Sequence, residues 1–455
     1  MAFDVVPVQR DDYAEFERVF RAGFGEIPGP ENQADLDFFD WCDLLGARQD
    51  GRIVGTAGSF GSELTLPGAV RLPTAAVTSV SVSPTHRRRG VLSAMMAEQL
   101  VAVRRAGVPL AVLTASEATI YSRFGYGPAT MAADFAIPVR GRALRQPSPV
   151  GDTRLLSQEE ARKTLPELYE PVSRTQVGEM SRPDGWWALA NSRDMAKNFA
   201  VVHRSDGIDD GYAIYGVEVK WEPGVSQNRL RVDELVAHSP AARSALLRYL
   251  LELDLVESVY LRVRPVEDEL RWLLADPRVL RARSVRDWLW VRPVDAAEVL
   301  SGRRYRVSDR LTIRIDDELC PWNSGTWSLE GSADGASCQP ARAGADPDLT
   351  MGPAGLGSLV LGGVNPSVLV DAGVIGAAAG FDRDRARPVL RDQSGPVLLH
   401  GFLNVAGLTR PPASLSASRP RLGRHGAHPA ARTPRAARAP ARSRPGTTGT
   451  PVRPG

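Results

Sequence analysis

The sequence has few of the features that mark secreted, membrane-spanning or metal-binding proteins. It holds three cysteines, Cys42, Cys320 and Cys338, which lie too far apart for a disulfide framework or a zinc site. No run approaches the ~20 apolar residues of a membrane span, and the first residues, MAFDVVPVQRDD, lack a signal-peptide core. The six histidines have no metal-ligand spacing with cysteine or carboxylates. These absences predict a cytoplasmic protein with no metal site and no membrane partner.

Acidic residues are missing from the C-terminal stretch 403–455, which contains ten arginines and no lysine. Subtracting this charge of +10 from the +3 of the whole chain leaves −7 for residues 1–402. An acidic body concentrates cationic partners. The stretch 403–455 also has nine prolines and no aromatic residue, so it cannot bury enough apolar area to offset chain entropy and is predicted to be disordered.

The body of 402 residues is long enough for two or three domains. Its first part alternates between helical and strand patterns. We expect a helix over 13–24, two strands over 51–60 and 62–73 joined by a short turn, a strand over 75–82, a helix over 91–105 stopped by Gly107, and a strand over 108–116.

A second passage repeats this rhythm and indicates an internal repeat. Residues 232–240 read as a strand, 241–253 as a helix and 258–263 as a strand, so that Ser239-Pro240 aligns with Ser83-Pro84. The basic turn is replaced there by Arg-Ser-Ala-Leu, so the second copy is expected to keep the fold and to lack the anion site. Residues 300–402 then show short strands with glycine turns and two helical segments, which is typical of an α+β module.

The turn SPTHRRRGVL carries the clearest chemistry. A strand enters it and a helix leaves it, so the unpaired N–H groups and the positive end of the helix dipole face a ligand. Arg87, Arg88 and Arg89 add guanidinium groups that bond two phosphate oxygens at once, and Gly90 lets the backbone come close. We predict a diphosphate site rather than a solvated charge run.

Two motifs, VSVSPTHRRRGVL and ASEATIYSRFGYGPAT, resemble the GCN5-related N-acetyltransferases, and more specifically the enhanced intracellular survival (Eis) family of actinobacterial aminoglycoside acetyltransferases. The resemblance spans residues 1–402. It implies an α/β and α+β fold with two tandem acetyltransferase domains, the second degenerate, and a sterol-carrier-protein-like module. The expected parts are the acetyl-CoA-binding domain 1–145, the degenerate domain 146–297, the module 298–402 and the tail 403–455.

The resemblance also implies how acetyl-CoA is held. The pantetheine arm would run along the main chain of two residues of the strand, and the pyrophosphate would lie on the basic turn. The implied cofactor-binding residues are Val80, Val82, Arg87, Arg88, Arg89, Gly90, Val91, Ser116 and Glu117.

For catalysis, the resemblance makes Tyr121 the general acid that protonates the departing thiolate, with Tyr126 as its competitor on sequence alone. A neutral amine attacks the thioester directly, and the main-chain N–H of Val80 is the expected oxyanion donor. The carboxylate of a terminal Phe402 would be the general base, which requires the chain to end there; in the full-length chain, Glu26 or a bound water must deprotonate the amine, or activity is weak. We interpret residues 403–455 as translation past a normal stop or in a shifted frame. Glu26 matches a position that meets the amine substrate.

The sequence therefore predicts an acetyl-CoA-dependent amine N-acetyltransferase acting on a cationic polyamine such as an aminoglycoside, assembled as a homo-oligomer, a hexamer by resemblance. Three alternatives remain. The protein could be a catalytically impaired family member, a nucleic-acid-binding protein that uses its basic tail, or a lipid-binding protein that uses its third module. The acidic body and the lack of aromatic residues in the tail argue against specific nucleic-acid recognition.

Overall fold

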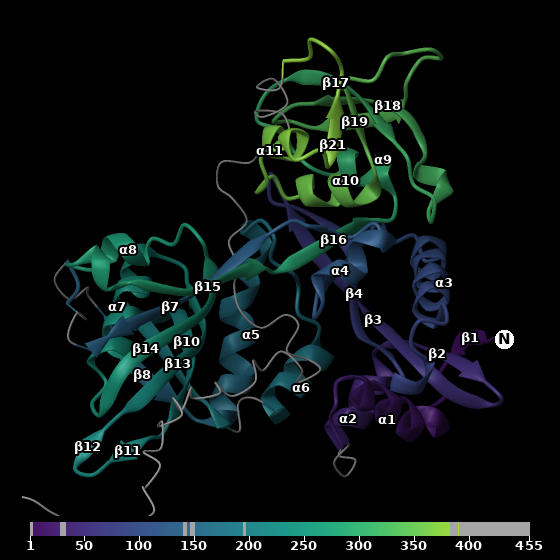
Figure 1. The fold of residues 1–455 in the computed structure, drawn as a ribbon. Coiled ribbons are helices and arrows are strands. Elements are labelled where there is room, and N and C mark those ends of the chain that lie inside the picture. Colours follow the sequence, from purple (N-terminus) through teal and green to yellow (C-terminus); the bar gives the residue numbers. More distant parts are fainter. Residues whose placement is uncertain are drawn as a thin grey trace, which may run out of the picture. The chain divides into compact units, whose positions relative to one another are not determined.

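The computed structural model describes residues 3–27, 33–139, 143–145, 151–193, 197–382 and 390. All of them belong to one compact unit that spans 1–409. Three main sheets organise this unit (Figure 1). Phe402 and the tail 403–455 lie outside the described residues. None of the described helices is long and apolar enough to cross a membrane.

The first sheet has seven strands, and it carries the predicted acetyl-CoA motif. In spatial order these are β1 (Asp4–Pro7), β2 (Asp43–Gln49), β3 (Arg52–Leu66), β4 (Val70–Val82), β5 (Leu110–Thr114), β16 (Leu289–Pro293) and β6 (Gly127–Pro128). The helices of this part are α1 (Tyr13–Gly23), α2 (Gln33–Asp40), α3 (Val91–Arg105) and α4 (Ala118–Tyr121).

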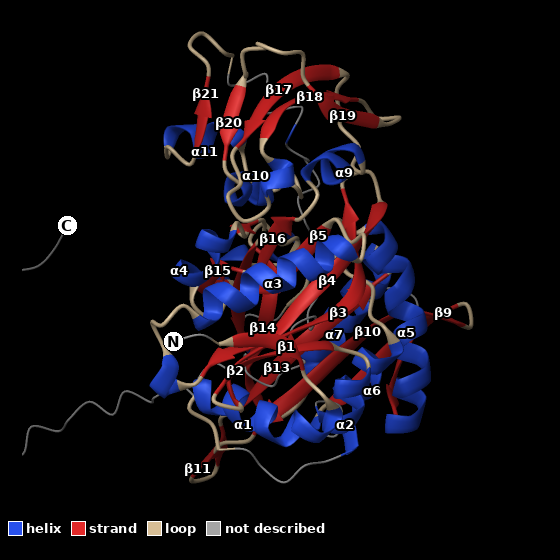
Figure 2. Ribbon diagram, turned by 90° about the vertical axis from the view of Figure 1, so that its right-hand side faces the viewer, coloured by secondary structure: helices blue, strands red, loops and turns tan. Residues whose placement is uncertain are grey.

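Alternating side chains of the first sheet build two cores, one on each face. Ile53 packs with the α1 residue Phe16, whereas its neighbour Val54 packs with the α3 residue Met95. Figure 2 shows α3 lying across β3 and β4. The helix predicted over 91–105 is confirmed at both ends, and Gly107, with φ +72°, follows its C-terminus.

The second sheet repeats this architecture. Its strands in spatial order are β15 (Arg281–Asp287), β7 (Met131–Pro138), β14 (Val256–Pro265), β13 (Asn228–Ala237), β10 (Ile208–Glu218), β9 (Phe199–Ser205) and β8 (Asp152–Leu156). A small hairpin of β11 (Trp221–Glu222) and β12 (Val225–Ser226) extends it, and its helices are α5 (Gln158–Thr175), α6 (Asp184–Arg193), α7 (Pro240–Glu252) and α8 (Leu270–Leu273). The repeat expected from the sequence is confirmed, because β13, α7 and β14 follow one another as β4, α3 and β5 do.

The third sheet has five strands and belongs to the C-terminal module. In spatial order these are β19 (Ala336–Pro340), β18 (Gly325–Gly331), β17 (Asp309–Ile315), β20 (Leu349–Met351) and β21 (Ile375–Ala377). Three helices accompany them, α9 (Ala296–Ser301), α10 (Pro353–Leu359) and α11 (Pro366–Asp371). The predicted α+β character of this module is confirmed.

The first two sheets exchange strands across the boundary expected at residue 145. Strand β7, from the first part of the chain, pairs with β14 and β15 in the second sheet. Strand β16, from the second part, pairs with β5 and β6 in the first sheet. The first sheet is therefore complete only with a strand from far along the chain.

One prediction about the strands was wrong. The turn expected between 51–60 and 62–73 is absent, because β3 runs through Gly61 to Leu66. The chain reverses instead after Pro67, where Gly68 has φ +85° and Ala69 φ +56°. Glycine tolerates this left-handed geometry, whereas Gly61 is an ordinary extended strand residue.

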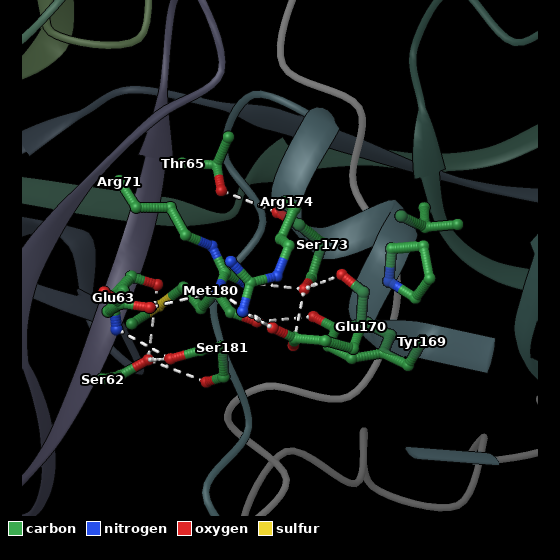
Figure 3. Close-up of polar contacts among 12 residues, drawn as sticks. Ser62, Glu63, Thr65, Arg71, Tyr169, Glu170, Ser173, Arg174, Met180 and Ser181 are labelled. Carbon is green, nitrogen blue, oxygen red and sulfur yellow. Dashed lines mark hydrogen bonds and ion pairs between the residues drawn. The ribbon is translucent and has the colours of Figure 1, made fainter. Parts of the chain in front are cut away.

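A polar cluster joins the hairpin of β3 and β4 to α5 (Figure 3). Arg71, whose side chain is 10% exposed, donates to Glu63, Glu170 and Ser173 over 3.1, 3.1 and 2.7 Å. The hydroxyl of Thr65 donates to the main-chain oxygen of Ser173 over 2.6 Å. These contacts between described residues hold the first two sheets together.

Candidate active site

Strands β4 and β5 run parallel but separate toward their C-terminal ends. Their pairing covers only Thr74 to Ala76 on β4 and Leu110 to Val112 on β5. Beyond Ala76 the two strands are no longer paired, so the main-chain groups along this edge of β4 face the space between the strands.

A β-bulge in β4 sits at this gap. Thr56 faces Ser81 and Gly58 faces Thr78, so Ser79 and Val80 stand opposite the single residue Ala57. Ser79 has φ +53°, and its main-chain oxygen accepts a 2.9 Å hydrogen bond from the buried hydroxyl of Thr56. A bulge turns the peptide groups of the strand away from the regular ladder, and Val80 is one of the two bulged residues.

The basic turn opens α3 as an anion site. Gly90, at the N-cap with φ +85°, has no side chain to occupy the first amides of the helix. Arg88 also has a positive φ, +63°, a conformation that costs a non-glycine residue about 1–2 kcal/mol. Arg87 donates to the main-chain oxygen of Gly23 over 2.8 Å and ties the turn to the end of α1.

The equivalent helix of the second sheet is closed by its own residues. The hydroxyl of Ser239 accepts from the N–H of Ala242 over 3.1 Å, and Pro240 occupies the first helical position. The N-cap side chain therefore satisfies a donor that is open at α3. This contrast fits the expectation that only the first copy keeps the anion site.

These elements surround a cavity of about 490 Å³, within the range typical of small-molecule sites. Eight of the nine sequence-predicted cofactor residues line it together with Tyr121. They are Val80, Val82, Arg87, Arg88, Gly90, Val91, Ser116 and Glu117. The remaining one, Arg89, is exposed and does not line the cavity.

The two tyrosines of the second motif are in different environments. Tyr121 lines the cavity, and burial, followed by the nearby charge of Glu117, raises its pKa to about 12. Tyr126 is fully buried behind it, its hydroxyl has no hydrogen-bond partner among the described residues, and burial raises its pKa as well. The rings pack edge to face with centroids 6.1 Å apart. Only Tyr121 can reach a ligand in this cavity.

Two other predicted site residues are not brought into the cavity. Glu26 does not line it, and Arg21 donates to its carboxylate over 2.9 Å. Phe402 lies outside the described residues. The roles of both residues therefore stay predictions.

Several lining residues were missed by the sequence reasoning. Gly23 and Phe24 come from the end of α1, and Arg123 adds a third arginine to the wall, its guanidinium 5.1 Å from the ring centroid of Phe124. Arg123 lies inside the motif ASEATIYSRFGYGPAT, two residues after Tyr121, so the sequence could have indicated that it lines the site. No local sequence pattern indicated that the end of α1 lies beside the cavity.

The cavity fits the chemistry of acetyl-CoA. Three arginines and an open helix N-terminus suit a phosphorylated end, and the free edge of β4 offers main-chain groups to an amide-containing arm. Among the described residues, no group of three or more His, Cys, Asp or Glu could hold a metal ion.

Comparison with known proteins agrees with this architecture. Models of an acetyltransferase (GNAT) domain match residues 4–129 and 178–293, and a model of a sterol carrier protein domain matches 296–397. The chain thus combines tandem GNAT domains with a sterol-carrier domain, and the predicted fold class is confirmed.

Relatives cover nearly the whole body of the chain. An uncharacterized N-acetyltransferase of Streptomyces coelicolor is 35% identical over 410 residues, covering 87% of this chain and 98% of the relative. N-acetyltransferase Eis of Mycobacterium tuberculosis is 33% identical over 386 residues, covering 80% and 90%. The crystal structure of Eis1 from Mycobacterium abscessus matches with a TM-score of 0.77 at 33% identity, covering 88% and 99%. The chain belongs to the Eis-like N-acetyltransferases of the GNAT family, whose members use acetyl-CoA.

Proposed function

We propose that this enzyme transfers the acetyl group of acetyl-CoA to an amine of a cationic polyamine such as an aminoglycoside. The single observation that carries the proposal is the cavity itself, which joins the free edge of β4, the open N-terminus of α3 and Tyr121. The charge of −7 on residues 1–402 supports a cationic acceptor.

In this proposal, Arg87, Arg88 and the amides after Gly90 hold the pyrophosphate. The main chain of Val80 and Val82 holds the pantetheine arm, and Ser116 and Glu117 line the far wall. Acetyl-CoA supplies the acetyl group as a thioester, and the acceptor amine attacks it directly.

Two groups of the chain then act on the reacting atoms. The N–H of Val80, which lies in the bulge of β4, donates to the negative charge that develops on the acetyl oxygen. The hydroxyl of Tyr121 donates its proton to the leaving thiolate. A tyrosine of high pKa is a slow donor unless it is well placed, so its geometry matters more than its acidity.

Thiol release from acetyl-CoA in the presence of an aminoglycoside tests the proposal. Tyr121→Phe is expected to lower kcat by about 100-fold or more, and Arg88→Ala to raise the KM for acetyl-CoA. Tyr126→Phe is the matched control, because it removes a hydroxyl that has no partner among the described residues and should keep most of the activity. Full activity of Tyr121→Phe would contradict the assigned acid.

The base is a separate part of the proposal. We infer that a carboxylate at Phe402 accepts the proton of the amine, so that a chain truncated after Phe402 should be more active than the full chain. Equal activity of the two forms would exclude this role. Inactivity of both on a panel of polyamines would show that the acceptor class is wrong.

A further inference from the structure

The turn that follows Tyr121 is built against the C-terminal module. Gly125 has φ +83°, and a Cβ there would lie 2.7 Å from Cγ of Pro353. A Cβ at Gly127 would overlap the main-chain oxygen of Ala354. Pro353 and Ala354 begin α10, so the module helix touches this turn at main-chain distance, and no side chain fits between them.

A buried ion pair stands at the same place. Arg292, on β16, donates from both terminal nitrogens to the two carboxylate oxygens of Asp317, each over 2.8 Å. The two side chains are 0% and 1% exposed. Asp317 belongs to the module, and it also accepts from the N–H of Cys320 and the side-chain amide of Asn323, both over 3.0 Å. A two-point pair of this kind fixes the plane of the guanidinium.

The fixed guanidinium backs the turn. A Cβ at Gly125 would lie 2.7 Å from Nε of Arg292, so the turn rests directly on this group. Tyr126 stands between the two close-packed glycines, and its ring meets that of Tyr121 edge to face. A continuous line of packed groups therefore runs from the module to the wall of the cavity.

The module also supplies part of the core behind Tyr121. Cys320 is fully buried in the hydrophobic cluster that contains Tyr121, Tyr126 and Trp290. Trp322 packs against the same cluster and donates to the main-chain oxygen of Val294 over 2.7 Å.

We propose that the sterol-carrier-like module positions the general acid, with the Arg292–Asp317 pair and α10 holding the turn Gly125–Gly127 and, through Tyr126, the side chain of Tyr121. The inference rests on the proposed function of Tyr121. The positioning residues are Arg292, Asp317 and Gly127, none of which lines the cavity.

The first test enlarges Gly127. Gly127→Ala pushes α10 away from β6, and a shift of about 1 Å at the acid is expected to lower kcat about 100-fold. The KM for acetyl-CoA should stay within about twofold, because the pyrophosphate turn is on α3. Gly61→Ala is the matched control, since a Cβ on this strand glycine meets no atom within 4 Å, and it should leave both constants unchanged.

The second test asks whether Gly127 acts through the hydroxyl of Tyr121. In the Tyr121→Phe background, Gly127→Ala should cause no further loss of kcat, because no proton donor is left to misplace. A merely structural effect would lower kcat by the same factor in both backgrounds.

The third test addresses the ion pair. Asp317→Asn leaves a buried guanidinium without its anion and destabilises the fold. Arg292→Lys keeps the charge and loses the two-point geometry, so it should lower kcat while the circular dichroism spectrum and the Kd for CoA are unchanged.

The outcomes separate the two proposals. Folded Gly127→Ala and Arg292→Lys enzymes with normal kcat, or equal losses in both backgrounds, would overturn the positioning role while an inactive Tyr121→Phe enzyme upheld the acid. A fully active Tyr121→Phe enzyme would overturn both.

Discussion

Three consecutive arginines, Arg87 to Arg89, occupy three different environments. Arg87 lines the cavity and is tied to the main chain of Gly23, Arg88 lines the cavity with a left-handed backbone, and Arg89 is exposed and does not line it. Three identical neighbours in the sequence are therefore not equivalent in the folded chain.

The left-handed backbone of Arg88 leads to a prediction that separates its strain from its charge. Arg88→Gly and Arg88→Ala both remove the guanidinium, so both should raise the Kd for CoA by the same factor in calorimetry. Glycine relieves the positive φ, so Arg88→Gly should be more stable than Arg88→Ala by about 1 kcal/mol in thermal unfolding. Equal stability of the two variants would show that the turn relaxes to another conformation.

The raised pKa of Tyr121 predicts the alkaline side of the pH–rate profile. A donor with a pKa of about 12 stays protonated through neutral and moderately alkaline pH. We therefore expect kcat to stay constant as the pH is raised to about 10. A fall near pH 8 or 9 would assign the proton to another group.

The same shift has a consequence for stability. The pKa of Tyr121 is higher in the folded chain than its ordinary value of 10.0, so the stabilisation by its neutral form is present below pH 10 and is lost as the pH rises toward 12. Tyr121→Phe should lose less stability across this window than the wild type does, which denaturant unfolding at several pH values would reveal.

At the scale of elements, the open end of α3 distinguishes the first of two similar repeats, whereas both β4 and its equivalent β13 carry a bulge. In both repeats the parallel pairing ends part-way along the strand, at Ala76 of β4 and Val232 of β13, but in the first repeat the helix amides are left open by Gly90. In the second, Ser239 caps its own helix. The difference lies in a few residues at the junction of strand and helix, while both repeats keep their sheets.

The hydrogen bond from Thr56 to Ser79 holds the bulge, and it can be removed with a matched control. Thr56→Val should cost about 1 kcal/mol of stability and lower kcat, because the N–H of Val80 loses its fixed direction. Thr65→Val removes an equally buried hydroxyl that bonds Ser173 instead, so it should cost similar stability and leave kcat unchanged. Equal kcat values for the two variants would contradict the proposal that the bulge positions an oxyanion donor.

At the scale of the whole molecule, the candidate site is built by contacts between parts that are distant in the chain. Strand β16 completes the active-site sheet, and the module touches the turn behind Tyr121. Buried charges reinforce the second sheet, where Arg182 pairs with Glu234 and stacks 3.6 Å from the ring centroid of Tyr169.

The polar cluster around Arg71 (Figure 3) is one of these contacts between distant parts, and its geometry predicts how much it contributes to the free energy of unfolding. Arg71→Ala should lower the free energy of unfolding by about 1–2 kcal/mol, because Glu63 and Glu170 are 47% and 41% exposed and solvent screens part of their attraction. Arg154→Ala, which removes an exposed pair with Glu160 and a longer one, 3.8 Å, with Asp209 within one domain, should have a smaller effect in urea unfolding. Equal effects would show that the cluster adds nothing beyond an ordinary surface pair.

The local elements of this protein were predictable because their signals are local. The apolar stripe of α3, the stop at Gly107 and the repeat of strand, helix and strand are periodicities within a few residues, and the structure confirms them. The turn at Pro67 was missed although Pro67-Gly68 is itself a local turn signal, whereas Gly61 carries no such neighbour and is an extended strand residue.

The sequence by itself determined the order of the elements, the basic turn that opens α3 and the two motifs that indicate an acetyltransferase. Only the tertiary structure decided that β16 enters the first sheet, that Tyr121 rather than Tyr126 faces the cavity, and that the C-terminal module stands behind that tyrosine. The physical reason is the range of the interactions. Periodicity and turn chemistry act between neighbours in the chain, whereas burial, strand exchange and the Arg292–Asp317 pair depend on residues that meet only after the chain has folded.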